Sequence, residues 1–135
     1  MVKSLKEILQ EEELLTIKGL QKLQTAYDQR FVADEFSGFD KVRHTYAHMG
    51  KLLGRLAEYV QMTEDGYENV SAEDIRTKVI PDLLVYAVWL ANEFNVDIES
   101  AYLQRFVENI RRLHIDEVSD EELQELNSLT IKRIS

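Results

Sequence analysis

Cysteine is absent from the 135-residue chain, which excludes disulfide bonds and thiolate metal sites. Proline occurs once and glycine five times, and this scarcity favours helices over a turn-rich β fold. No apolar run approaches the roughly 20 residues that a membrane-spanning helix requires, so we expect no membrane association. The lack of cysteine is consistent with the cytoplasm, which is the location we expect.

Basic residues are in the minority, because 16 lysines and arginines face 25 acidic residues and the net charge is −9. Such a surface opposes binding to nucleic acid polymers, and we expect none. One stretch, between Asp40 and Glu58, departs from this balance and is locally basic. Its basic residues and histidines are Lys41, Arg43, His44, His48, Lys51 and Arg55.

Apolar spacing and capping signals predict helices over residues 5–31, 41–62, 72–94 and 98–113, with a short fifth helix after Ser119. The capping signals include a capping box of Ser4 and Glu7, and a helix stop at Asn95 that is followed by a cap at Asp97. Pro81 falls inside the third pattern, where it predicts a kink or a helix boundary. Hydrophobic residues make up 44% of the chain, enough for one core. We therefore expect a single all-α domain over residues 1–135, an antiparallel four-helix bundle with an additional short C-terminal helix.

The second predicted helix carries an apolar stripe that we expect to face the core. Its members are Val42, Thr45, Met49, Leu52, Leu53, Leu56 and Val60. Gly50 and Gly54 in the same helix have a spacing that permits close helix packing, either within the chain or at a dimer seam.

A second stripe on this helix is polar and lies largely opposite the apolar one. It consists of His44, His48, Lys51, Arg55 and Glu58. A solvated helix face is one interpretation, and an anion site is the other. Two histidines alone are too few ligands for a metal site. On the third helix, Asp82 interrupts an apolar run, so we expect an ion pair with Arg55 or Lys51, or a capping role.

Several blocks of the sequence resemble all-α nucleotide pyrophosphohydrolases of the MazG type, mainly over residues 39–113. Residues 51–61, Lys-Leu-Leu-Gly-Arg-Leu-Ala-Glu-Tyr-Val-Gln, resemble the family segment Glu-Glu-x-Gly-Glu-Leu-Ala-Glu-x-x-Gln. Residues 81–91 resemble the family's Asp-Val-Leu-x-Tyr-x-x-x-Leu-Ala signature, and residues 94–101 resemble its Leu-Gly-Ile-Asp-Leu-Glu-x-Ala segment. Residues 108–112 are similar to a terminal block with an asparagine and nearby arginines.

The resemblance implies a dimer or tetramer that cleaves nucleoside triphosphates to monophosphate and pyrophosphate. In the family, four acids of an E-x-x-E and an E-x-x-D motif hold Mg²⁺. Carried over to this chain, those positions are Leu52, Arg55, Val79 and Asp82, so only Asp82 keeps an acid. Because Arg55 places a positive charge where the cation would lie, we predict that the usual magnesium mechanism is absent.

The leading hypothesis is a homodimeric MazG-like pseudoenzyme that binds a nucleotide or another phosphate-containing ligand without hydrolysing it and needs no cofactor. The predicted ligand-binding residues are His48, Lys51, Arg55, Asp82, Asn109 and Arg112. One alternative is an active pyrophosphohydrolase in which Glu58, Glu73 or Asp74 rebuilds a Mg²⁺ site with Asp82. Another is a helical protein–protein interaction or regulatory module, with the acidic segment 116–125 as one docking surface.

Overall fold

The computed structural model describes residues 3–4, 7, 9–10, 16–32 and 38–134, and these ranges form helices and turns without β-strands. The described helices are α2 (Ile17–Phe31), α3 (Gly38–Glu64), η2 (Ile75–Val79), α4 (Ile80–Glu93), α5 (Ile98–Leu113) and α6 (Asp120–Ile134). The expectation of an all-α protein is confirmed. None of these helices is both long and apolar enough to cross a bilayer.

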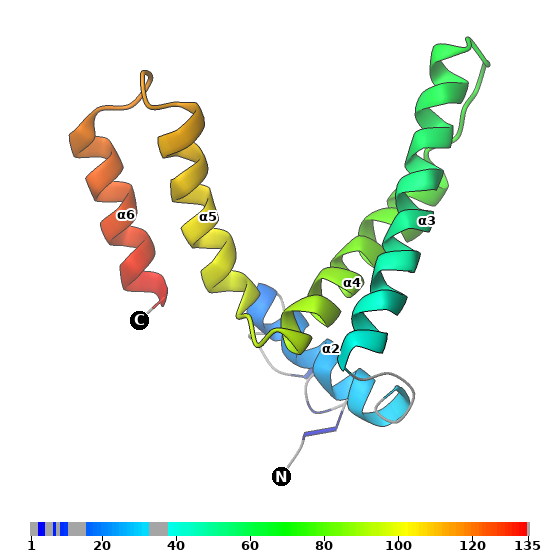
Figure 1. Cartoon of the computed structure of the whole chain (residues 1–135), viewed down its shortest axis with the longest axis horizontal. Coiled ribbons are helices and arrows are strands. Elements are labelled where there is room, and N and C mark those ends of the chain that lie inside the picture. The colour runs from blue at the N-terminus through cyan, green and yellow to red at the C-terminus, as the bar shows by residue number, and fades with distance from the viewer. Residues whose placement is uncertain (1–2, 5–6, 8, 11–15, 33–37, 135) are drawn as a thin grey trace.

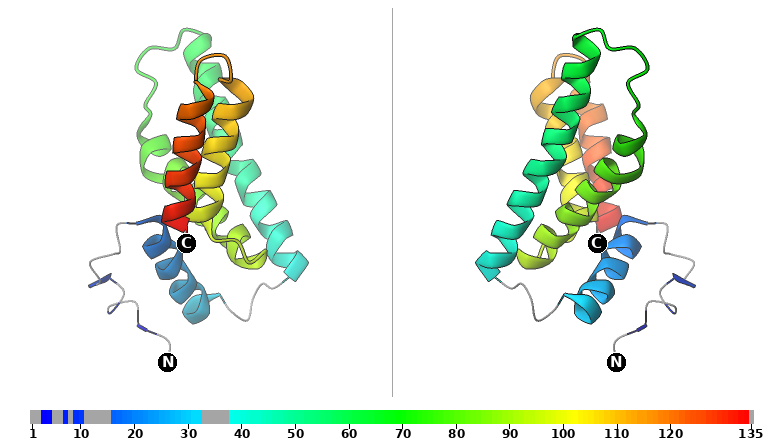
Figure 2. Two further views of the ribbon diagram at one scale, coloured as in Figure 1. Left: turned by 90° about the vertical axis from the view of Figure 1, so that its left-hand side faces the viewer. Right: turned by 90° about the vertical axis from the view of Figure 1, so that its right-hand side faces the viewer.

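The described helices form two arms that diverge from a common base (Figure 1). In one arm, α3 runs outward and the chain returns through η2 and α4 alongside it. In the other, α5 runs outward and α6 returns beside it. Helix α2 lies at the base, where it contacts both α4 and α5. In Figure 2 the α5–α6 pair faces the viewer in the left view and the α3–α4 pair does so in the right view. This arrangement is more open than a closed four-helix bundle.

Capping interactions explain where most helices begin and end. Thr16 caps α2 by accepting a hydrogen bond from the Gly19 backbone N–H at 2.9 Å. Asp97 caps α5 by accepting one from the Glu99 N–H at 3.1 Å, which confirms the predicted cap. The α4 helix stops at Asn95, whose φ of 55° places it in the left-handed region that ends many helices. The predicted bounds 98–113 agree with the observed α5.

One helix prediction requires correction, and another lies mostly outside the described ranges. The first helix was predicted to begin near residue 5; Glu7 and Leu9 are helical, most of residues 5–15 lie outside the described ranges, and α2 begins at Ile17. The C-terminal helix α6 is not short, because its 15 residues equal the length of α2. Packing against α5 and the cap at Ser119, which accepts from the Glu122 N–H at 3.1 Å, support this length.

Pro81 coincides with a change of helix type rather than a simple kink. The five residues of η2 form a π-helix, in which the Ile80 N–H donates to the Ile75 carbonyl, and α4 follows without a break. Pro81 has no N–H to donate and lies in the first turn of α4, where that donor is not needed. The wider π turn therefore lets one continuous helical segment pass through the proline.

Buried apolar side chains gather mainly where α2, α3 and α4 meet. Among the described residues they are Ala26, Leu52, Val79, Val88, Trp89, Ala91 and Val107. This core is small for the number of apolar residues in the chain, because many large apolar side chains on the described α-helices stay exposed. The prediction that the whole apolar stripe of the second helix faces the core is wrong: Leu53, Leu56 and Val60 are exposed, since α4 covers only one side of α3.

Candidate functional site

Two of the four positions that the family resemblance assigns to metal ligands are occupied by core residues. Leu52 on α3 is 5% exposed and Val79 on η2 is 1% exposed, and these two helices contact each other. The other two positions differ, because Arg55 is exposed and Asp82 is half-buried. Apolar packing between α3 and η2 thus replaces carboxylates at half of the expected positions, and an aliphatic side chain offers a cation no ligand atom.

A polar cavity of about 310 Å³ opens beside this packing, between the second half of α3 and the segment that leads into η2. Its charged lining consists of Arg55 and Glu58 from α3 with Asp74 and Lys78 from the opposite side. Lys78 is held by Asp74 at 3.3 Å. Its remaining lining residues are Tyr59, Met62, Val70, Ser71 and Ile75.

Arg55 is the cation that this cavity leaves available. Among the ion pairs within 4.0 Å that the described residues form, none involves Arg55 or Glu58. A guanidinium presents several N–H donors in a planar fork that suits a phosphate or carboxylate. An anion entering the cavity would therefore meet Arg55 without first having to displace an internal carboxylate from it.

Asp82 does not pair with the basic stripe. The described residues form no ion pair between Asp82 and either Arg55 or Lys51, so the predicted pairing is not formed. Asp82 is also absent from the lining of the cavity that holds Arg55 and Glu58. Its charge acts instead on Tyr86, one turn later on α4: burial, and then Asp82, raise the pKa of the Tyr86 phenol.

The histidines of the basic stripe belong to an aromatic stack between α3 and α4. The His48 ring stacks on Tyr86 with centroids 5.3 Å apart, and the His44 ring stacks on Trp89 at 5.7 Å. Partial burial, followed by the charges of His44 and Lys51, lowers the pKa of His48. Stacking explains why both histidines lie here, and the described residues contain no group of three or more His, Cys, Asp or Glu side chains placed to hold a metal.

Sequence reasoning missed Asp28, the most buried carboxylate of the described chain. Asp28 is 8% exposed, and its Oδ1 accepts hydrogen bonds from Trp89 Nε1 at 2.9 Å and Gln24 Nε2 at 2.8 Å. Its Oδ2 is buried without a partner. Burial raises the pKa of Asp28 even though both hydrogen bonds and the charge of Lys41 act in the opposite direction.

The signal for Asp28 was hidden because α2 meets the rest of the protein through a polar face. Gln21, Thr25 and Asp28 follow one another at helical spacing and point toward α4 and α5, whereas Tyr27 and Phe31 are exposed. Amphipathic reasoning assigns an apolar face to core or dimer packing, so it gave no reason to expect contacts through the polar side of this helix. The i, i+4 pair of Gln24 and Asp28 was the available hint.

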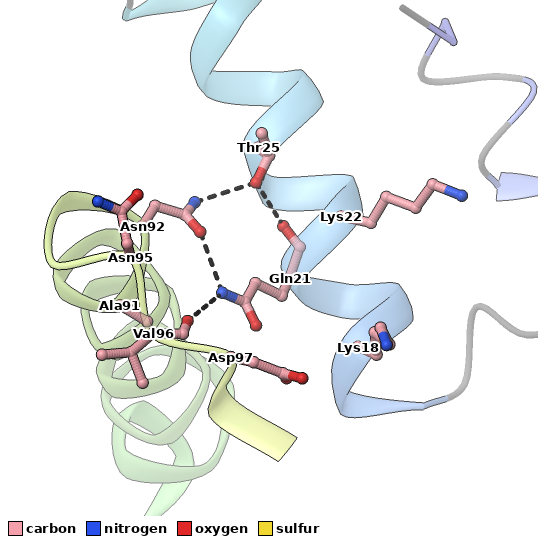
Figure 3. A pocket seen from close by; sticks show the side chains of 9 residues that line it. All are labelled: Lys18, Gln21, Lys22, Thr25, Ala91, Asn92, Asn95, Val96 and Asp97. Carbon is pink, nitrogen blue, oxygen red and sulfur yellow. Dashed lines mark hydrogen bonds between the residues drawn. The ribbon is translucent and has the colours of Figure 1, made fainter. Parts of the chain in front are cut away.

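A wider groove of about 580 Å³ lies between α2 and the turn that joins α4 to α5 (Figure 3). Gln21 spans it by donating to Asn92 Oδ1 at 3.1 Å and to the Val96 carbonyl at 2.9 Å, and its Oε1 accepts from the Ile98 N–H at 3.2 Å. Asn92 in turn donates to Thr25 Oγ1 at 3.0 Å. Since these polar groups already satisfy one another, the network serves to attach α2 rather than to hold a ligand.

The structure divides the predicted ligand residues between the two arms. His48, Lys51, Arg55 and Asp82 lie on α3 and α4, whereas Asn109 and Arg112 lie on α5. On α5, Arg112 Nη2 donates to Asn109 Oδ1 at 3.4 Å in an exposed contact. One chain therefore does not bring Asn109 and Arg112 to the cavity that holds Arg55.

Comparison of the chain with protein-family models, with curated proteins and with solved structures finds no match. The likeness to MazG-type enzymes therefore rests on the sequence blocks alone and remains a prediction. The chemistry of the site follows from its own residues: an unpaired guanidinium in a polar cavity is suited to binding an anion.

Proposed function

We propose that this protein binds a phosphate-containing ligand, of which a nucleotide is the leading candidate, in the cavity between α3 and η2, and that it does so without metal-dependent hydrolysis. The observation that supports this most is Arg55, a cation that lines a polar cavity of about 310 Å³ and forms no ion pair with any residue that the structure describes. That volume lies at the lower end of the range for small-molecule sites.

Neighbouring groups extend the proposed anion site along α3. Lys51 lies one turn before Arg55 and is exposed, so it can follow a phosphate chain that leaves the cavity. Lys78 faces Arg55 across the cavity but is neutralised by Asp74. Glu58 in the same lining repels phosphate and favours a ligand that also carries hydrogen-bond donors, such as a nucleobase or sugar.

The proposal is tested by titrating pyrophosphate, a nucleoside monophosphate and a nucleoside triphosphate into the protein with EDTA present, by isothermal calorimetry. We expect binding that weakens with salt, and Arg55→Glu should weaken it at least tenfold, because charge-assisted hydrogen bonds to phosphate are lost and a like charge is introduced. Arg105→Glu is the matched control, since it makes the same charge change at an exposed arginine on α5 that is not among the predicted ligand residues. No binding at millimolar ligand, or equal losses in both variants, would contradict the proposal.

The hydrolase alternative makes a different prediction. It needs Asp82 to share a cation with Glu58, Glu73 or Asp74, but the cavity lined by Glu58 and Asp74 is not lined by Asp82. Release of pyrophosphate from nucleoside triphosphates in the presence of Mg²⁺ or Mn²⁺, abolished by Asp82→Ala, would favour this alternative over the binding-only function.

A third function, as an interaction module, is favoured by one observation: large apolar side chains on every described α-helix are exposed. We also propose that these exposed apolar faces complete an antiparallel MazG-like bundle when the protein associates. Two open arms are the form expected of a chain that completes its core against a second copy.

A further inference from the structure

Helix α3 carries a second apolar face that no described part of the chain covers. Phe39, Tyr46, Leu53 and Val60 recur every seventh residue, and each is between 46 and 79% exposed. Between them, Val42, Met49 and Leu56 occupy the positions three residues further on. Apolar residues at the first and fourth positions of a heptad are the pattern of a helix that pairs with another helix.

This face, hereafter the α3 seam, is distinct from the side that contacts α4. Thr45 and Leu52 are buried on the α4 side, whereas Leu53, the next residue after Leu52, is exposed on the seam. The seam extends over most of the 27 residues of α3, a length of about 40 Å. Burial of these Phe, Tyr, Leu and Val side chains against a partner would be favourable, because removing apolar surface from water lowers the free energy.

One glycine beside the seam, Gly50, points to close approach by something outside the described chain. Gly50 lies within α3, where it costs about 1 kcal/mol of helix stability relative to alanine. A Cβ atom added there would meet nothing within 4 Å. Packing within the described chain therefore does not require this glycine, whereas a neighbouring helix on the seam would use the space.

The exposed surface area leaves room for a large interface. A compact monomer of this mass is expected to expose about 7,300 Å². The chain exposes 10375 Å², an excess of about 3,000 Å². A stable dimer interface buries about 800 Å² on each partner, and obligate dimers bury more, so the excess is ample for one.

We infer that the α3 seam pairs with the same seam of a second copy, and that the two helices run antiparallel about a two-fold axis close to Leu53. The charged residues beside the seam favour this relative orientation of the two helices. Arg43 and Glu64 flank the seam at opposite ends of α3, at the same heptad position and at almost equal distances from Leu53. Antiparallel pairing places Arg43 near Glu64 of the partner subunit, whereas parallel pairing in register leaves these opposite charges at opposite ends of the interface. The same register places Gly50 beside Ala57 of the partner subunit.

The dimer is independent of the proposed ligand site and is tested on the full chain by size-exclusion chromatography with light scattering. Wild type should have the mass of a dimer at micromolar concentration. Leu53→Glu combined with Val60→Glu should give a monomer of unchanged helix content by circular dichroism. Leu84→Glu, a change at an exposed leucine on α4, should remain dimeric. A monomeric wild type would overturn the inference, and so would a dimer that survives the double change.

Orientation is tested with charge exchange and cross-linking. Arg43→Glu and Glu64→Arg should each weaken the dimer about tenfold, and the double variant should recover wild-type affinity. Parallel pairing predicts no such recovery. Because the chain has no native cysteine, single-cysteine variants report proximity directly. A short bismaleimide should join two copies of Leu53→Cys but not of Val60→Cys, and efficient cross-linking of both would refute the antiparallel arrangement.

Discussion

Replacement of Asp28 by asparagine tests how burial and hydrogen bonding compete in the core of this protein. The carboxylate is 8% exposed, and Trp89 Nε1 and Gln24 Nε2 both donate to its Oδ1. Its Oδ2 has no partner. Burial outweighs the favourable contacts, because the pKa of Asp28 is raised. Asparagine keeps an oxygen that accepts from both donors but removes the buried charge.

The magnitude follows from two opposing effects. Leaving a buried polar group unpaired costs about 1–3 kcal/mol, and more for a charged group. Against this, two charge-assisted hydrogen bonds become neutral ones, which are roughly half as strong. Because the pKa is raised, the first effect is the larger. We therefore expect Asp28→Asn to increase the free energy of unfolding by about 1 kcal/mol at pH 7.

The raised pKa of Asp28 also determines how the stability difference between wild type and Asp28→Asn changes with pH. A raised pKa in the folded state means that the native protein binds a proton more tightly than the unfolded chain. Asp28 therefore contributes stability at pH values below its ordinary pKa of 3.8, and this contribution is lost as the pH rises through the raised value. The advantage of Asp28→Asn over wild type should consequently be largest at neutral pH and vanish in acid.

Urea unfolding at a fixed protein concentration, between pH 3.5 and 8, measures the difference. Trp89 is the only tryptophan and donates to Asp28, so its fluorescence reports directly on the site. Asp65→Asn is the control, because it removes the same charge from an exposed turn. The reasoning fails if Asp28→Asn is destabilising at pH 7, or if its effect is independent of pH and equal to that of the control.

Three further changes test the packing by urea or thermal unfolding. Gln21→Ala removes three hydrogen bonds that attach α2 and should cost about 1–2 kcal/mol; a loss no greater than that of Lys18→Ala on the rim of the same groove would refute the role of the network. Leu52→Ala empties a buried position and should cost about 3 kcal/mol, against less than about 0.5 for the exposed Leu129→Ala; similar values for the two would show that Leu52 is not core. Asn95 has a φ of 55°, so Asn95→Gly should be neutral or stabilising and Asn95→Val should cost about 1–2 kcal/mol; equal tolerance of both would contradict the left-handed backbone.

Local features of the sequence predicted most helix boundaries. Asn95 and Asp97 separate α4 from α5 as expected, because left-handed backbone and side-chain capping depend on residues a few positions apart. The reciprocal hydrogen bonds of Ser4 and Glu7, at 2.8 and 3.2 Å, form the predicted capping box. Thr16 was missed, although it begins α2 by the same mechanism.

The candidate site was only partly predictable. Arg55 stood out because a cation occupied a position where the family resemblance expected an acid, and it does line a polar cavity. Its expected partner Asp82 instead acts on Tyr86, and Asn109 lies on the other arm. Spacing along one helix fixes which side chains share a face, but it does not determine which helix that face meets.

The sequence by itself therefore determined the helical class, the caps and the absence of acids at three of the four family positions, since these depend on residue type and short-range spacing. Tertiary structure alone decided that α2 packs through its polar side, that Leu52 and Val79 fill the core, and that α3 keeps an apolar seam in solvent. The physical reason is that burial is a property of pairs of surfaces. An amphipathic pattern shows that a face requires a partner, whereas the partner is chosen by the packing of the whole chain, and here, we infer, by a second copy.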